Sequence, residues 1–184
     1  MAVKSNLTNM VLVLGLTCLF CSAILGGAYV LTEKPIAAAA AEKTNRAIAQ
    51  VLPSFTEVSY NADSKYYTAT DGETVVGYAI ETTTVGFGGP LSLIVGVTPD
   101  GVVYNTSVLS HAETPGLGAK CTTDEKFMSQ WKGFDPSIKK LSVKKDGGDV
   151  DAITASTITS RAYTLAVENA LKTFNEIMGG QDNE

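Results

Sequence analysis

The chain has 184 residues, of which 45% are hydrophobic and 18% charged, and its formal net charge is −5. This length allows one domain of ordinary size plus an appendage, and the composition excludes a disordered or collagen-like class. A nucleic-acid partner is not expected, because binding a phosphate backbone needs a basic face and the lysines cluster only at residues 139–140 and 144–145.

An apolar N-terminal stretch predicts a membrane anchor. Residues 10–31 carry no charge, and a helix of that length spans roughly 30 Å, the thickness of the hydrocarbon core of a lipid bilayer. The alternative is a cleaved signal peptide with the small residues 37–41 as its processing site, but this apolar run is longer than a usual signal core. We therefore predict a short cytoplasmic segment at 1–9, a transmembrane helix at 10–31 and a helical connector at 32–50. Lys4 before the apolar run favours the cytoplasmic side for the N-terminus.

The remaining residues, 51–184, predict one α+β domain. Runs of β-branched and aromatic residues separated by turn residues predict its strands. Segments 52–59 and 66–70 are expected to be short strands or loops, and strands are expected at 74–84, 91–98, 102–109 and 138–143. Pro99-Asp100-Gly101 predicts a hairpin between 91–98 and 102–109. A short helix is expected at 124–131, and apolar residues from Ala166 to Met178 recur at the spacing of one face of a C-terminal helix. This order favours an antiparallel sheet with flanking helices over a parallel doubly wound sheet.

A hydroxyl-rich segment stands immediately before the C-terminal helix. Five of the seven residues from Thr154 to Ser160 carry a hydroxyl group. A helix start offers unpaired N–H groups and a partial positive charge, so it binds anions such as phosphate. The alternative is simple capping, because Ser and Thr are common residues at a helix N-terminus. Composition alone leaves both interpretations open.

A second notable segment, residues 111–120, follows the hairpin. Pro115, Gly116 and Gly118 predict a tight loop whose backbone a ligand can approach closely. His111 is the only histidine, and no cluster of metal-ligand residues accompanies it, so we interpret it as a residue at a strand end and predict no metal site. No sequence typical of a serine hydrolase or of a nucleotide-triphosphate loop is present either.

Both segments together resemble the FMN-binding domain of the G subunit of Rnf complexes. This family includes the C subunit of the sodium-pumping NADH:quinone reductase. The resemblance lies in His-x-Glu-Thr-Pro-Gly-Leu-Gly-x-Lys at 111–120 and Asp-Ala-Ile-Thr-Ala-Ser-Thr-Ile-Thr-Ser at 151–160, and the anchor and Gly-Gly-Pro at 88–90 also fit.

The resemblance implies that FMN is bound covalently, through a phosphoester on the last threonine of a Ser/Thr-Gly-Ala-Thr motif. Here Thr154 matches the first position, Ala155 and Ser156 replace glycine and alanine, and Thr157 is the acceptor. Ala155 lacks the freedom of glycine to take a positive φ, and Ser156 places a second hydroxyl beside the acceptor.

The resemblance also assigns the loop at 111–120 to the flavin. Its candidate contacts are Glu113, Thr114, Gly116, Leu117, Gly118 and Lys120. Glu113 and Thr114 would hydrogen-bond the ring or ribityl chain, and Leu117 would contact the ring. Lys120 would balance charge near the phosphate or the ring.

The implied function is electron transfer within a membrane-bound ion-translocating ferredoxin:NAD oxidoreductase. The partners would be the other subunits of that complex, the coupling ion Na⁺ or H⁺, and a flavin transferase that uses FAD and magnesium for attachment. The domain at 51–184 would lie on the extracytoplasmic side of a bacterial cytoplasmic membrane. The alternatives are the C subunit of the quinone reductase, which is usually longer, and a membrane-anchored module that binds a free phosphate-bearing ligand.

Overall fold

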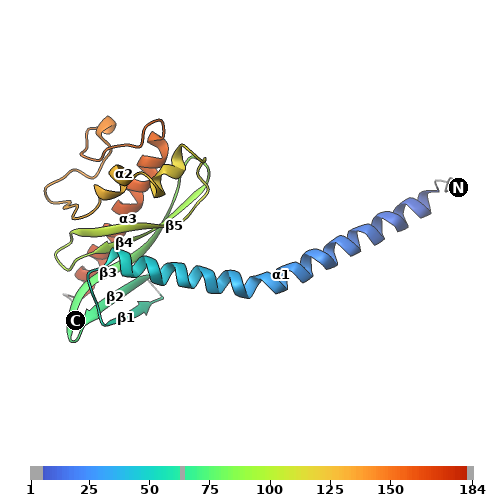
Figure 1. The fold of residues 1–184 in the computed structure, drawn as a ribbon, viewed down its shortest axis with the longest axis horizontal. Helices are drawn as coiled ribbons and strands as arrows, with labels where there is room; N and C mark the ends of the chain where they lie inside the picture. Colours follow the sequence, from blue (N-terminus) through green and yellow to red (C-terminus); the bar gives the residue numbers. More distant parts are fainter. Residues whose placement is uncertain (1–5, 63–64, 182–184) are drawn as a thin grey trace. The chain divides into compact units, whose positions relative to one another are not determined.

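The structure, a computed structural model, describes residues 6–62 and 65–181. The chain forms two compact units, Met1–Glu42 and Lys43–Glu184, and each is considered by itself. Helix α1 (Leu7–Val51) belongs to both units, since it begins in the first and ends in the second (Figure 1).

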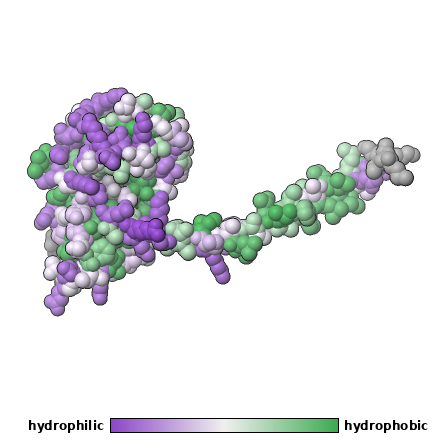
Figure 2. Space-filling view, in the orientation of Figure 1, coloured by the Kyte–Doolittle hydropathy of each residue, from purple (hydrophilic) through white to green (hydrophobic). Residues whose placement is uncertain are grey.

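The first unit is the apolar part of α1. Leu12, Val13 and Leu14 are all exposed although consecutive helix residues point about 100° apart, so exposed apolar side chains are not confined to one face. The side of this segment that Figure 2 shows is mostly hydrophobic. Among the described residues, α1 is the one helix long and apolar enough to cross a membrane. It continues past Pro35 without a break, although proline removes one helical hydrogen bond. The segments predicted as anchor and connector thus lie in one helix.

The second unit is built on an antiparallel sheet of five strands, whose spatial order is the order of the sequence. The strands are β1 (Glu57–Asn61), β2 (Tyr66–Asp71), β3 (Thr74–Val85), β4 (Pro90–Val97) and β5 (Val103–His111). The helices that follow are η1 (Gly118–Thr122), α2 (Glu125–Ser129), η2 (Lys144–Asp146) and α3 (Thr157–Gln181). This architecture confirms the predicted α+β class.

Helices cover both faces of the sheet, and the interior strand β4 is therefore apolar on both sides. Its residues Leu91, Leu93 and Val95 are fully buried in the larger core, which α3 completes. Ile94 points to the opposite face, where it packs with residues from the end of α1. A Cβ atom at Gly96 would lie 1.7 Å from the carbonyl oxygen of Val51, so glycine allows α1 to approach the sheet.

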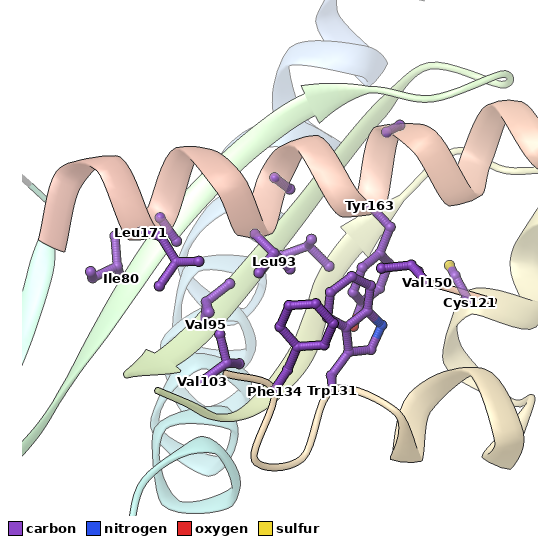
Figure 3. Close-up of a cluster of buried hydrophobic side chains, with 14 of the residues drawn as sticks. Ile80, Leu93, Val95, Val103, Cys121, Trp131, Phe134, Val150, Tyr163 and Leu171 are labelled. Carbon is purple, nitrogen blue, oxygen red and sulfur yellow. The ribbon is translucent and has the colours of Figure 1, made fainter. Parts of the chain in front are cut away.

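An aromatic cluster fastens the segment after η1 to α3 (Figure 3). The ring of Trp131 stacks on Tyr163 with 5.3 Å between centroids, and Phe127 meets Tyr163 edge-on at 5.0 Å. The Tyr163 hydroxyl is hydrogen-bonded to that of Thr106 at 2.7 Å, and burial raises the Tyr163 pKa. Aromatic pairs of this kind add about 0.5–1.5 kcal/mol beyond burial of their area. The cluster therefore fixes α2 and the start of α3 in one position.

Two predictions about secondary structure differ from the observed fold. Residues 138–143 form turns rather than a strand, and only Val143 pairs, in a single parallel bridge with Val150. The cause is the backbone of Lys140, whose N–H donates to the Asp149 carboxylate at 2.7 Å while its carbonyl accepts from Ser142 at 2.8 Å. The C-terminal helix also begins earlier than predicted, at Thr157, so it includes part of the hydroxyl-rich segment.

Candidate functional site

The structure brings the two segments singled out in the sequence to one pocket of about 350 Å³. Its walls come from the turn before β4, the loop after β5 and the first turn of α3. The lining residues are Phe87, Glu113, Thr114, Leu117, Gly118, Ala155, Ser156, Thr157, Ile158 and Thr159. The candidate residues Gly116, Lys120 and Thr154 do not line it, and all three are exposed.

Glu113 joins the three walls of this pocket. Its side chain is 5% exposed, and Oε2 accepts a hydrogen bond from Thr159 Oγ1 at 2.7 Å. The other oxygen, Oε1, accepts from the backbone N–H of Gly88 at 3.3 Å. A Cβ at Gly118 would lie 2.2 Å from Glu113 Oε2, so only glycine leaves room for this arrangement. Both carboxylate oxygens thus hold protein segments together.

The turn before α3 is held in a strained conformation. Ala155 has a φ of +62°, in the left-handed region that costs a residue with a Cβ about 1–2 kcal/mol. Ser160 fixes this turn, because its Oγ donates to the Ser156 carbonyl at 2.9 Å and accepts from Ile153 N–H at 2.9 Å. The substitution of alanine for the glycine of the resembled motif therefore leaves the turn itself in place.

Ser156 contributes a buried hydroxyl to the pocket wall. The residue is 7% exposed, and within the described part of the chain its Oγ has no hydrogen-bond partner. A buried polar group without a partner costs about 1–3 kcal/mol. A ligand with acceptor oxygens, such as a phosphate, fits this position, because it would accept a hydrogen bond from Ser156 beside the half-buried Thr157.

Lys145 contacts the lining residue Thr157, although sequence reasoning did not identify it. Its Nζ donates a hydrogen bond to Thr157 Oγ1 at 3.1 Å. Phe87, Ile158 and Thr159 are further lining residues that the sequence analysis did not single out. In the sequence, Lys145 is visible only as part of the basic pair at 144–145, and that pair does not indicate which residue Lys145 contacts.

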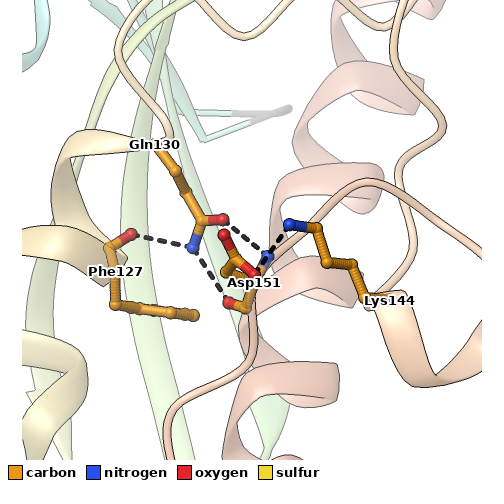
Figure 4. A network of polar contacts seen from close by, with 4 residues as sticks. All are labelled: Phe127, Gln130, Lys144 and Asp151. Atoms are coloured by element: carbon orange, nitrogen blue, oxygen red, sulfur yellow. Dashed lines mark hydrogen bonds and ion pairs between the residues drawn. The ribbon is translucent and has the colours of Figure 1, made fainter.

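The segment that leads into the motif is tied to α2 through a polar network (Figure 4). Gln130 Nε2 donates to the Asp151 carbonyl at 3.1 Å, and Asp151 N–H donates to Gln130 Oε1 at 2.8 Å. Lys144 forms an ion pair with the Asp151 carboxylate at 2.9 Å. These contacts fix where the hydroxyl-rich segment begins.

A larger hollow, about 960 Å³, lies along β5 and contains His111 but none of the hydroxyl-rich residues. The His111 Nδ1 accepts a hydrogen bond from Glu113 N–H at 3.2 Å, which makes His111 part of the turn at the end of β5.

The same hollow contains Cys121, and its pKa is raised to about 11 by burial and then by the nearby Glu113. Within residues 6–62 and 65–181, no group of three or more His, Cys, Asp or Glu side chains could hold a metal ion. Size alone therefore does not identify the functional pocket.

Comparison with known proteins places this geometry in a family. Residues 86–172 match the family described as FMN-binding domain. The G subunit of the proton-translocating ferredoxin:NAD(+) oxidoreductase complex of Clostridium ljungdahlii is 34% identical, over 98% of this chain and 94% of that protein. The G subunit of an ion-translocating oxidoreductase complex from Methanosarcina acetivorans is 30% identical, over 93% of this chain and 96% of that protein.

The fold has a counterpart among solved structures. NqrC of Shewanella oneidensis superposes with a TM-score of 0.50 at 21% identity, over 71% of this chain and 73% of that one. That likeness concerns the fold alone, whereas the relatives in sequence extend over nearly the full length. The chain belongs to the family of G subunits of ion-translocating oxidoreductase (Rnf) complexes, and it contains the FMN-binding domain of that family.

Proposed function

We propose that this electron-transfer protein carries FMN covalently, joined through a phosphoester to Thr157. The observation that supports the proposal most directly is the pocket shared by the two motifs, whose lining includes Thr157 and also Ser156, a residue with a buried hydroxyl that has no partner among the described residues. Bound flavin supplies the redox chemistry, and the protein contributes binding, orientation and electrostatics.

The apolar rim of the pocket suits a flat aromatic ring. Phe87, Leu117 and Ile158 line the pocket and are 70%, 44% and 51% exposed. Covering such side chains is favourable by about 25 cal/mol per Å² of apolar surface. Leu117 thus keeps the role expected from the sequence, and Phe87 and Ile158 join it. Thr114 remains a candidate hydrogen-bonding group for the ring or ribityl chain.

The polar end of the pocket suits a phosphate. Thr157 is the first residue of α3, so a phosphate there lies at the positive end of the helix dipole. Ser156 supplies a buried donor on the same side. Glu113 lines the same pocket, and both of its carboxylate oxygens accept hydrogen bonds from the protein, from Thr159 and Gly88.

Attachment needs a transferase and a flavin donor. With FAD as the donor, a bond forms between Thr157 Oγ1 and the flavin phosphorus, and the phosphoanhydride bond of FAD breaks. AMP is the leaving group and the hydroxyl proton passes to solvent, so no oxidation or reduction is involved. The partial exposure of Thr157 leaves the hydroxyl accessible to such an enzyme.

The proposal includes a membrane arrangement. Residues 1–9 would be cytoplasmic, α1 would anchor the chain in the lipid bilayer, and the domain at 51–184 would face the extracytoplasmic side. The other subunits of the complex would supply and accept the electrons, coupled to transport of Na⁺ or H⁺. The C. ljungdahlii relative is named as part of a proton-translocating ferredoxin:NAD(+) oxidoreductase complex, which favours this assignment over the C subunit of the quinone reductase.

Mass analysis tests the attachment. The full chain, purified after co-expression with a flavin transferase, should gain the mass of FMN minus water on the peptide that contains Thr157. Thr157→Ala should abolish this gain, whereas Thr173→Ala, a matched change near the other end of α3, should retain it. If flavin were found on Ser156 in the T157A protein, the attachment site proposed here would be the wrong hydroxyl group. An unmodified wild-type chain that binds free phosphate ligands would favour the non-covalent alternative.

A further inference from the structure

The ammonium group of Lys145 lies against the proposed attachment atom. Lys145 Nζ donates to Thr157 Oγ1 at 3.1 Å, across twelve residues of sequence. In the described part of the chain no carboxylate is ion-paired with Lys145, so its charge is not neutralised by a direct partner. Lys145 is exposed, but the loop that carries it is held in place on both sides of the residue.

An arginine clasp holds the loop of Lys145 onto α3. Arg161 donates from Nε and Nη2 to the two carboxylate oxygens of Asp146, at 2.7 and 2.6 Å. Arg161 stands four residues after Thr157 in the helix, so both side chains lie on one face. The hydrogen bond from Arg161 holds the pKa of Asp146 below its usual range.

The residue on the other side of Lys145 is tied down as well. Lys144 pairs with Asp151 at 2.9 Å, and Asp151 is fixed in turn by Gln130. The carboxylates of Asp146 and Asp151 are thus neutralised by Arg161 and Lys144. The loop places the ammonium group of Lys145 against the first residue of α3, while the Asp146 carboxylate, which also feels the charge of Lys145, is paired with Arg161.

We propose that Lys145 is the counter-ion of the phosphodiester on Thr157, an assignment that rests on the covalent attachment proposed above. Esterification replaces a neutral hydroxyl by a group with one negative charge, shared by two non-bridging oxygens. An ammonium group that already donates to Oγ1 would be in a position to pair with them. The oxygens around the phosphorus also carry negative charge during transfer from FAD, so the same ammonium group stabilises the transition state of attachment.

The experiment compares rates of attachment in full-length chains. Wild type, Lys145→Gln, Lys145→Arg and Lys140→Gln are each co-expressed with the flavin transferase, and the FMN-bearing fraction is followed by intact mass. Lys140→Gln is the matched control, because it removes an exposed lysine of the same segment. Lys145→Gln should slow attachment about fivefold. Lys145→Arg should restore most of the rate, and the control should match wild type.

A second measurement separates the phosphate from contacts with the transferase. In fully loaded chains, the ³¹P resonance of the phosphodiester should shift in K145Q and coincide between wild type and K140Q. Equal rates and coincident resonances for K145Q and K140Q would overturn the role of Lys145. A wild-type chain without flavin on Thr157 would instead refute the proposed attachment, so the two failures are distinct.

Discussion

Replacing Ala155 by glycine should stabilise the protein. Ala155 has a φ of +62°, which costs about 1–2 kcal/mol for a residue with a Cβ. Glycine removes that strain but adds about 0.4–1 kcal/mol of conformational entropy to the unfolded chain. The midpoints of these two ranges leave a net gain of about 0.8 kcal/mol. For a chain of this length it corresponds to a rise of roughly 1–4 °C in Tm, measurable by calorimetry of the full chain in detergent.

Two comparisons make this prediction specific to the backbone strain. Ala152→Gly, in the same motif but without a positive φ, should lower Tm, because no strain is relieved and a half-buried methyl group is lost. Lys65→Gly should raise Tm, because Lys65 has a φ of +51°. If A155G lowered Tm as much as A152G, the strain at Ala155 would not be stored in the folded state and the reasoning would be wrong.

Three further changes probe the contacts around the pocket. Thr159→Val removes the hydrogen bond to the buried Glu113 carboxylate and should destabilise the domain by about 1–3 kcal/mol in urea unfolding; an unchanged midpoint would contradict the role given to Glu113. Burial raises the pKa of Cys121 to about 11, so peptide mapping at pH 8 should show alkylation at least about tenfold slower in the native chain than in urea, and equal rates would exclude a protected thiol. The pKa of Asp146 is lowered in the folded state. The pair of Asp146 with Arg161 therefore contributes its full stabilisation of the folded chain at any pH above the ordinary pKa of aspartate, and this contribution is lost as the pH falls through the lowered pKa. The difference in Tm between wild type and D146N should accordingly persist from neutral pH and close only below about 3.9; closure at higher pH would argue against the clasp.

Local patterns predicted most of the sheet, because its strands and hairpin depend on neighbouring residues. Alternating β-branched residues and Pro99-Asp100-Gly101 set β4 and β5 to within a residue or two. The strand expected at 138–143 failed for a non-local reason, since the carboxylate of Asp149 satisfies the backbone there.

The candidate site, too, was predicted in part from the sequence, and the remainder depends on contacts between distant residues. The resemblance selected residues that line the pocket, but their packing around Glu113 depends on Gly88 and Thr159, which lie far from it in sequence. Lys145 could not be predicted at all. Its contact with Thr157 depends on how its loop folds against α3, where Arg161 binds the adjacent Asp146, and no periodicity or spacing in the sequence indicates that packing.

Two neighbouring residues before α3 each carry a local energetic cost. Ala155 is strained and the buried hydroxyl of Ser156 has no partner among the described residues, and such costs persist only where surrounding contacts enforce them. Here those contacts are the hydrogen bonds of Ser160 and of Thr159 with Glu113, and all of them are made by protein atoms alone. The turn is therefore held by contacts within the protein itself. A turn held in this way would present Thr157 and Ser156 to a phosphate with little further ordering of the backbone, which would keep the loss of conformational entropy on binding small.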